Sequence, residues 1–217
     1  MSAPRLELTD QASGRQLSCA AILFDMDGTL VDSRTCVEQT WRAWCGLHGL
    51  DRAALFGISP GRRNRDTVAA VAPHLDVERE VAWLVRAEEK CRQGLRAVNG
   101  AGAVLNQIPG QRWAIVTSAW RSLAEIRLRA AGLPLPGVLV SADDVTHGKP
   151  HPEGYLRAAE ALGVAPRDCV VVEDAAVGLQ AAAAAAVPAI GITTSDPSLT
   201  PCLWRMPNLS RLTVRYC

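Results

Sequence analysis

The stretch FDMDGTLVDS, residues 24–33, follows an apolar run, residues 19–24, whose composition predicts a β-strand buried on both faces. Asp25 and Asp27 lie two positions apart at the end of this strand, so in an extended chain their side chains leave the same face. Gly28 then allows the backbone to turn sharply. Such a pair can divide the work between a nucleophile or metal ligand and a general acid–base group. An isolated pair is more often a turn or a helix cap, so its meaning depends on the rest of the chain.

Short apolar runs that stop at small polar or acidic residues recur along the chain. They occupy residues 113–116, 138–140, 169–172 and 189–192, and helical patterns at residues 121–131, 152–162 and 175–186 separate them. Strands that alternate with helices predict an α/β fold with a doubly wound parallel sheet. In such sheets ligands bind beyond the carboxyl ends of the strands, which is where the polar residues after each run gather.

The segment of residues 33–97 interrupts this alternation. It contains no comparable strand run, but apolar residues recur at helical spacing in residues 37–47 and 77–91. We therefore expect a helical cap at residues 33–97, inserted into a main domain made of residues 1–32 and 98–217. A turn-rich segment between the two helical patterns, GISPGRRNR, carries Arg62, Arg63 and Arg65.

Composition narrows the class of protein. The 217 residues are 48% hydrophobic and 21% charged, which predicts a folded globular protein. Because 23 basic residues balance 22 acidic ones, no overall field attracts nucleic acid or an anionic membrane. No apolar run is long enough to span a membrane, and we expect a cytoplasmic protein. The seven cysteines are odd in number and lack a Cys-x-x-Cys pair, which argues against a zinc site and against a disulfide framework.

Further strand ends carry groups that complement the two aspartates. They are the hydroxyls and backbone amides of Thr117 and Ser118, the ammonium group of Lys149, and the carboxylates of Glu173 and Asp174. A phosphoryl group in transfer spreads negative charge over three oxygens, which calls for a cation, hydrogen-bond donors and usually Mg²⁺. Mg²⁺ prefers oxygen ligands, and Asp25, Asp174 and the carbonyl of Asp27 could supply them. We therefore predict a phosphate site with Mg²⁺ as its cofactor.

With these motifs, the chain resembles the haloacid dehalogenase superfamily of phosphotransferases over nearly its whole length. The matching motifs, in order, are FDMDGTLVDS, AIVTSA, HGKPHPEGY and VVVEDAAVGLQAA, at residues 24–33, 114–119, 147–155 and 170–182. The resemblance implies a Rossmann-like core with a mobile helical cap inserted just after the first motif. It also implies a reaction through an aspartyl-phosphate intermediate.

The resemblance assigns a role to each matching position. Asp25 would be the nucleophile, Asp27 the general acid and then the base, Thr117 and Lys149 the phosphate binders, Asp174 a metal ligand, and Glu173 a holder of metal-bound water. Within the superfamily the chain is most similar to phosphatases of sugar phosphates and glycerol phosphate. The implied partner is thus a small phosphorylated metabolite, with no nucleic acid or membrane. We expect the three cap arginines to select among phosphate esters, although a solvated basic loop without this role would have the same sequence pattern.

Two alternatives to a phosphatase stay open on the sequence. A phosphomutase resembling β-phosphoglucomutase would use the same two aspartates and return the phosphoryl group to a second hydroxyl. A non-catalytic phospho-acceptor would resemble response-regulator receivers, but these place their lysine much nearer the aspartate than the 124 positions between Asp25 and Lys149.

The chain also departs from the family pattern at two places. Ala186 stands where the family normally has a glycine, at the end of a predicted helix, so we expect a left-handed backbone there. The tail at residues 195–217 matches no pattern of the family.

Overall fold

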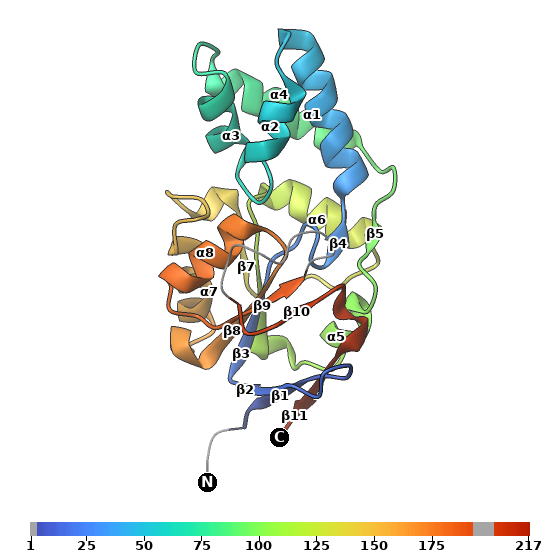
Figure 1. Cartoon of the computed structure of the whole chain (residues 1–217), viewed down its shortest axis with the longest axis vertical. Coiled ribbons are helices and arrows are strands. Elements are labelled where there is room, and N and C mark those ends of the chain that lie inside the picture. The colour runs from blue at the N-terminus through green and yellow to red at the C-terminus, as the bar shows by residue number, and fades with distance from the viewer. Residues whose placement is uncertain (1–3, 193–201) are drawn as a thin grey trace.

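A central parallel sheet organises the molecule (Figure 1). The computed structural model describes residues 4–192 and 202–217, and within them six strands form this sheet. In spatial order they are β10 (Arg205–Met206), β9 (Ala189–Ile192), β8 (Cys169–Glu173), β3 (Ala21–Phe24), β6 (Trp113–Val116) and β7 (Leu139–Val140). Every neighbouring pair is parallel. The α/β doubly wound fold predicted from the sequence is therefore confirmed.

The register of the central strands brings the polar strand ends together. Phe24, the last residue of β3, pairs with Val172 of β8 on one side and with Ile115 of β6 on the other. All residues of these three strands are buried, as continuous apolar runs predict. The residues that follow them therefore meet at one edge of the sheet.

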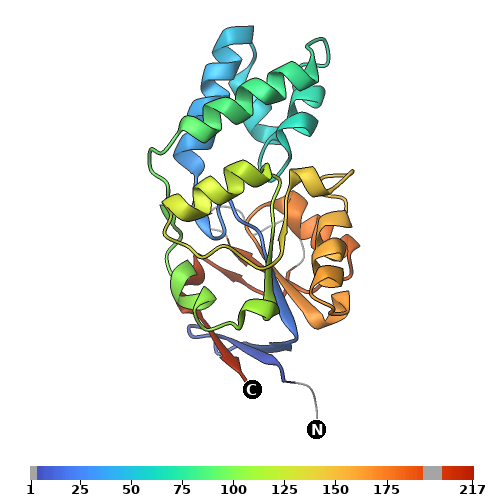
Figure 2. The same ribbon diagram turned by 180° about the vertical axis from the view of Figure 1, so that it is seen from behind.

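Two pairs of helices cover the two faces of the sheet (Figures 1 and 2). On one face lie α5 (Ala101–Leu105) and α6 (Arg121–Ala130), and on the other α7 (Glu153–Ala161) and α8 (Ala176–Ala184). The helical patterns at residues 121–131, 152–162 and 175–186 thus match α6, α7 and α8 to within two residues at each end.

The residues that follow these helices include Ala186, where the chain departs from the family pattern. Gly132 and Gly163, which follow α6 and α7, have φ values of 67° and 66°. Ala186 takes the equivalent place after α8 with a φ of 55°, and it is the only residue other than glycine with a positive φ in the described part of the chain. The expected left-handed backbone at Ala186 is confirmed.

A second sheet closes the bottom of the molecule as drawn in Figure 1. It is antiparallel, with β1 (Leu6–Asp10) between β2 (Gln16–Cys19) and β11 (Leu212–Tyr216). The single strand predicted at residues 19–24 is wrong in its first part, because β2 ends at Cys19 and β3 begins at Ala21. Within the unassigned tail, β10 and β11 extend one sheet each, and residues 195–201 lie outside the described residues.

Four helices between residues 34 and 90 stand above the carboxyl edge of the large sheet (Figure 1). They are α1 (Arg34–His48), α2 (Arg52–Ile58), α3 (Asn64–Val71) and α4 (Val77–Lys90). They enclose a separate hydrophobic cluster around Trp44, Leu55 and Leu84. The sequence patterns identified only α1 and α4, because α2 and α3 are too short to show a clear period. No helix of the described chain has the length and apolarity needed to cross a membrane.

The chain enters and leaves these helices through adjacent segments. The short strands β4 (Val31–Asp32) and β5 (Arg96–Ala97) pair antiparallel at this junction. Next to them a disulfide joins Cys36 in α1 to Cys91 after α4, with 5.7 Å between the Cα atoms. The expectation of no disulfide is thus wrong for this pair, because partners 55 residues apart become neighbours only once α1 and α4 pack. The other five cysteines are free.

Candidate active site

A buried ion-pair cluster lies at the carboxyl edge of the central strands. Asp25 follows β3 directly, and Glu173 is the last residue of β8. Lys149, on the loop before α7, donates from Nζ to Asp25 Oδ1 at 2.6 Å and to Glu173 Oε2 at 2.7 Å. All three side chains are buried. The structure therefore brings together three residues that lie up to 148 positions apart in the chain, from Asp25 to Glu173.

Tyr155 completes this cluster and is a residue that the sequence interpretation left without a role. Its hydroxyl donates to Glu173 Oε2 at 2.6 Å, and the Nζ of Lys149 lies 5.3 Å from the centre of its ring. The backbone amides of Asp174 and Ala175 donate to the other Glu173 oxygen. Glu173 is thus held from four directions. The only signal for Tyr155 in the sequence is its place in α7, one turn after the lysine loop.

The electrostatics of the cluster favour a bound cation. Burial, and then the Glu173 carboxylate, raise the pKa of Asp25 to about 8, although Lys149 opposes both. Burial lowers the pKa of Lys149, but the carboxylates of Asp25 and Glu173 raise it more, so the net pKa is well above its usual value. Lys149 therefore stays charged, and one ammonium group faces more than one carboxylate.

Asp174 adds a third carboxylate to this edge. One oxygen each from Asp25, Glu173 and Asp174 can be chosen so that all lie within 4.8 Å of one another, which suits a shared ion. Gly28 has a φ of 90°, and a Cβ atom there would lie 2.1 Å from Asp174 Oδ2. Only glycine leaves the Asp174 carboxylate its place beside the aspartate loop. These oxygen donors and this cradle fit the Mg²⁺ that the sequence predicts.

Thr117 and Ser118 follow β6 at the same edge. Thr117 is buried, and its Oγ1 accepts a hydrogen bond from the amide of Ala119 at 3.1 Å. The hydroxyl of Ser118 donates to the carbonyl of Gly61, in the loop between α2 and α3, at 2.8 Å. The Ser118 hydroxyl therefore contacts the helices above the sheet, which leaves its backbone amide as its group for a phosphate.

Asp27 lies apart from the lysine cluster and contacts a residue that the sequence interpretation missed. Its Oδ2 accepts a hydrogen bond from Nη1 of Arg127 at 2.9 Å, and its Oδ1 is buried with no hydrogen-bond partner in the described chain. Arg127 lies on the buried face of α6 beside Leu123 and Leu128. A charged residue on the apolar face of an otherwise regular helix was the available signal.

The three arginines of the turn-rich segment have different surroundings. Arg63 binds Asp66 through two hydrogen bonds and also donates to the carbonyls of Val145 and Thr146 across the gap to the core. Arg65 pairs with Glu78. Arg62 is half-buried, and its guanidinium has no partner among the described residues. Arg63 and Arg65 also line a cavity of about 280 Å³ together with Trp120 of the core.

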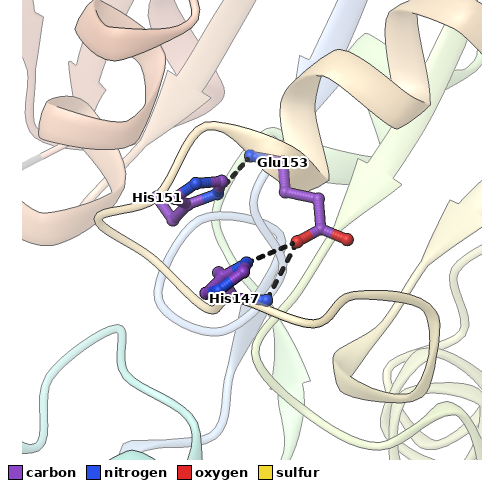
Figure 3. Close-up of side chains that lie close together, drawn as sticks. All are labelled: His147, His151 and Glu153. Atoms are coloured by element: carbon purple, nitrogen blue, oxygen red, sulfur yellow. Dashed lines mark hydrogen bonds and ion pairs between the residues drawn. The ribbon is translucent and has the colours of Figure 1, made fainter.

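Glu153, the first residue of α7, braces the loop that carries Lys149. Its carboxylate accepts hydrogen bonds from the backbone amides of Thr146 at 3.0 Å and His147 at 2.9 Å. These bonds lower the pKa of Glu153 to about 2. Figure 3 shows His147 beside this carboxylate and His151 beside the backbone amide of Glu153. The two imidazole rings are tilted by 35° to each other, with 4.6 Å between their centres. The loop is therefore fixed at both sides of the lysine.

Comparison with known proteins assigns this arrangement to a family. The sequence model of the haloacid dehalogenase-like hydrolases matches residues 19–186. The chain belongs to the haloacid dehalogenase-like hydrolase family. The match begins before the first strand of the large sheet and ends at Ala186, so it includes every group of the candidate active site.

Curated members of the family with related sequences are phosphatases. The chain is 38% identical over 190 residues to hexitol phosphatase A of Escherichia coli, with 85% of this chain and 87% of the relative covered. It is 34% identical over 192 residues to glycerol-1-phosphate phosphohydrolase 2 of Saccharomyces cerevisiae, with 82% and 76% covered.

Solved structures of other proteins share the fold. A hydrolase from Pseudomonas syringae superposes with a TM-score of 0.79 at 22% identity, covering 88% of this chain and 95% of that one. This likeness concerns the fold alone, because the identity is low.

Proposed function

We propose that the protein is a Mg²⁺-dependent phosphatase that hydrolyses a small sugar or polyol phosphate through an aspartyl-phosphate intermediate. The observation that carries this proposal is the buried Asp25, bound to Lys149 and close enough to Asp174 to share an ion with it. This arrangement at one edge of the sheet supports the roles proposed for them, with Asp25 as nucleophile, Lys149 as phosphate-binding cation and Asp174 as metal ligand. The hexitol and glycerol phosphatases named above support the substrate class.

The reaction takes two steps with the residues in the places described. A carboxylate oxygen of Asp25 attacks phosphorus, the bond to the ester oxygen breaks, and Asp27 gives a proton to the departing alcohol. Asp27 then takes a proton from a water molecule, whose oxygen attacks the phosphoryl group and frees Asp25 and inorganic phosphate. When bound, Mg²⁺ offsets the negative charge of the phosphoryl oxygens. Its proposed protein ligands are Asp25, Asp174 and the carbonyl of Asp27.

The remaining core residues bind and orient. Lys149, the hydroxyl of Thr117 and the backbone amides of Thr117 and Ser118 hold the phosphoryl oxygens. Glu173 fixes Lys149 through its Oε2 and, with Mg²⁺ bound, would hold a water of the ion without binding the ion itself.

Residues 33–97 act as the cap in this proposal, and residues 1–32 and 98–217 as the catalytic core. The contacts of Gly61 with Ser118 and of Arg63 with Val145 and Thr146 support a closed cap, which would exclude water from the site. We also propose a cytoplasmic location for the enzyme. The Cys36–Cys91 disulfide is the one observation that a reducing compartment would not favour.

A panel of sugar, polyol and nucleotide phosphates, assayed for phosphate release with Mg²⁺ and with excess chelator, tests the proposal. We expect release from sugar or polyol phosphates with Mg²⁺ and none with chelator. Positional isomers in place of free phosphate, detected by ³¹P NMR, would show the phosphomutase instead. A stable phosphoprotein without turnover would show a phospho-acceptor.

A further inference from the structure

A buried arginine connects the proposed acid–base residue with the cap. Arg127 lies on α6, and 4% of its side chain is exposed. Its Nη1 donates to Asp27 Oδ2 at 2.9 Å, and its Nη2 lies 3.6 Å from Oε2 of Glu88. Glu88 belongs to α4, which packs against α6 (Figures 1 and 2). One guanidinium group therefore contacts a carboxylate on each side of the boundary between cap and core.

The cost of burying these charges indicates that the three groups depend on one another. An arginine keeps its proton in proteins, and a buried guanidinium is tolerated only when carboxylates pair with it. The pKa of Glu88 is raised above its usual value, because burial and the Asp27 carboxylate raise it more than the nearby Arg127 lowers it. Glu88 and Asp27 thus share one cation. If the cap moved away, Glu88 would leave this group, and water would reach the Arg127 guanidinium beside Asp27.

The two oxygens of Asp27 have different surroundings. Oδ2 is held by Arg127, whereas Oδ1 is buried and has no hydrogen-bond partner in the described residues. A buried carboxylate oxygen without a partner is costly, so such an atom points to a group that arrives with the substrate. Oδ1 is therefore the oxygen available to exchange a proton with the leaving alcohol or the attacking water.

We propose that Arg127 is a positioning residue that holds Asp27 by Oδ2 for proton transfer at Oδ1, and that Glu88 makes this arrangement depend on cap closure. The inference rests on the proposed function, because it needs Asp27 to act as the acid and base. Its consequence is that proton transfer is fully organised only when the cap covers the substrate, which protects the aspartyl-phosphate from untimely hydrolysis when the cap is open.

Leaving-group dependence tests this role with the full-length protein in Mg²⁺. The alcohol of glycerol 1-phosphate needs a proton to leave, whereas p-nitrophenolate leaves without one. In single-turnover experiments, Arg127→Met should slow glycerol release by about 10²-fold, the lower end of the range for general acid catalysis. The first burst of p-nitrophenolate from p-nitrophenyl phosphate should change little, because that step does not use Asp27.

Three further variants make the test specific. Glu88→Gln should give a smaller loss with the same dependence on the leaving group, and the double variant should be no slower than Arg127→Met, since the two residues act together. Arg127→Lys keeps a cation, so it should recover part of the glycerol rate, and it replaces Arg127→Met if that variant does not fold. Arg129→Met is the control, because it removes an exposed pair with Glu125 on the same helix and should change neither rate.

The inference is overturned if Arg127→Met slows the release of glycerol and of p-nitrophenolate equally, or if it slows neither. The Asp27→Asn variant distinguishes a failure of this inference from a failure of the proposed function. If Asp27→Asn shows the leaving-group dependence and Arg127→Met does not, Arg127 has no positioning role and the phosphatase mechanism stands. If Asp27→Asn itself turns over like the parent, the proposed mechanism fails.

Discussion

The carboxyl edge of the large sheet and the helices above it contribute to the site in different ways. Asp25, Thr117 and Glu173 leave adjacent parallel strands, and the pairing of Phe24 with Val172 and Ile115 fixes their places through the backbone. The helices of residues 34–90 reach the same region through loop and side-chain contacts, among them those of Gly61, Arg63 and Glu88. We therefore expect the core residues to determine the reaction, and the residues of the proposed cap to affect its timing and its choice of ester.

The strongest way to test this division is to remove the proposed nucleophile of the core. Asp25→Asn should abolish phosphate release from every ester, because Glu173, the other carboxylate bound to Lys149, is held in place by Tyr155 and two backbone amides and cannot act as the nucleophile instead. Phosphate release is measured with each substrate in Mg²⁺. Asp25→Ala is the control against slow deamidation of the asparagine, and full activity in the alanine variant would refute the mechanism.

A second core prediction concerns the loop that carries Lys149. Because the folded pKa of Glu153 is about 2, below its usual value of 4.5, the ionised carboxylate stabilises the fold above pH 4.5 and this stabilisation is lost as the pH falls towards 2. Glu153→Gln should therefore lower the free energy of unfolding by about 2 kcal/mol at neutral pH, the scale of a hydrogen bond to a charged group.

Urea unfolding at pH 7 and at pH 3 measures this effect. The gap between parent and Glu153→Gln should be smaller at pH 3. Glu160→Gln is the matched control, because Glu160 is exposed on the same helix. A gap that stays the same at both pH values would show that the charge of Glu153 does not matter.

The cap predicts a different pattern, in which selectivity changes. Arg62 has no partner in the described chain and lies beside the Gly61 contact with the core, so Arg62→Ala should shift relative kcat/KM among sugar and polyol phosphates by up to about tenfold, the effect of one substrate contact. Arg65→Ala should shift it less, because Arg65 pairs with Glu78. Arg63→Ala should reduce kcat/KM for all esters, since it removes the contacts of Arg63 with Val145 and Thr146.

Steady-state kinetics on the substrate panel, with a small aryl phosphate as reference, separate these outcomes. A uniform loss in Arg62→Ala would place Arg62 with the phosphoryl-binding groups. Unchanged ratios in all three variants would assign selectivity to other cap residues.

The smallest effect belongs to Ala186, where stability changes without chemistry. An L-residue in the left-handed region costs roughly 1–2 kcal/mol, and Ala186 has a φ of 55°. Ala186→Gly should raise the melting temperature and leave the dependence on Mg²⁺ unchanged. Calorimetry of parent and variant checks this, with Gln180→Gly, at an exposed position in the middle of α8, as a control that should lower the melting temperature. A lower melting temperature in Ala186→Gly would contradict the prediction.

The sequence predicted most strands of the large sheet but none of the small sheet as a sheet. Continuous apolar runs located β3, β6, β7, β8 and β9, because strands buried on both faces need apolar residues at every position. The β1–β2–β11 sheet went unnoticed, since its strands come from opposite ends of the chain and only their pairing makes them a sheet. The short helices α2 and α3 were missed because fewer than three turns give little periodicity.

The sequence by itself determined the α/β fold and the order of the polar strand ends, because both follow from local patterns and from the rule that parallel strands gather their carboxyl ends at one edge. Only the tertiary structure showed which side chains from distant segments meet. Arg127 between Asp27 and Glu88, Tyr155 on Glu173 and the disulfide of Cys36 with Cys91 all depend on how helices pack against the sheet and against each other. A backbone pattern repeats along the chain and is therefore visible in the sequence, whereas a buried contact exists only where two segments approach in space.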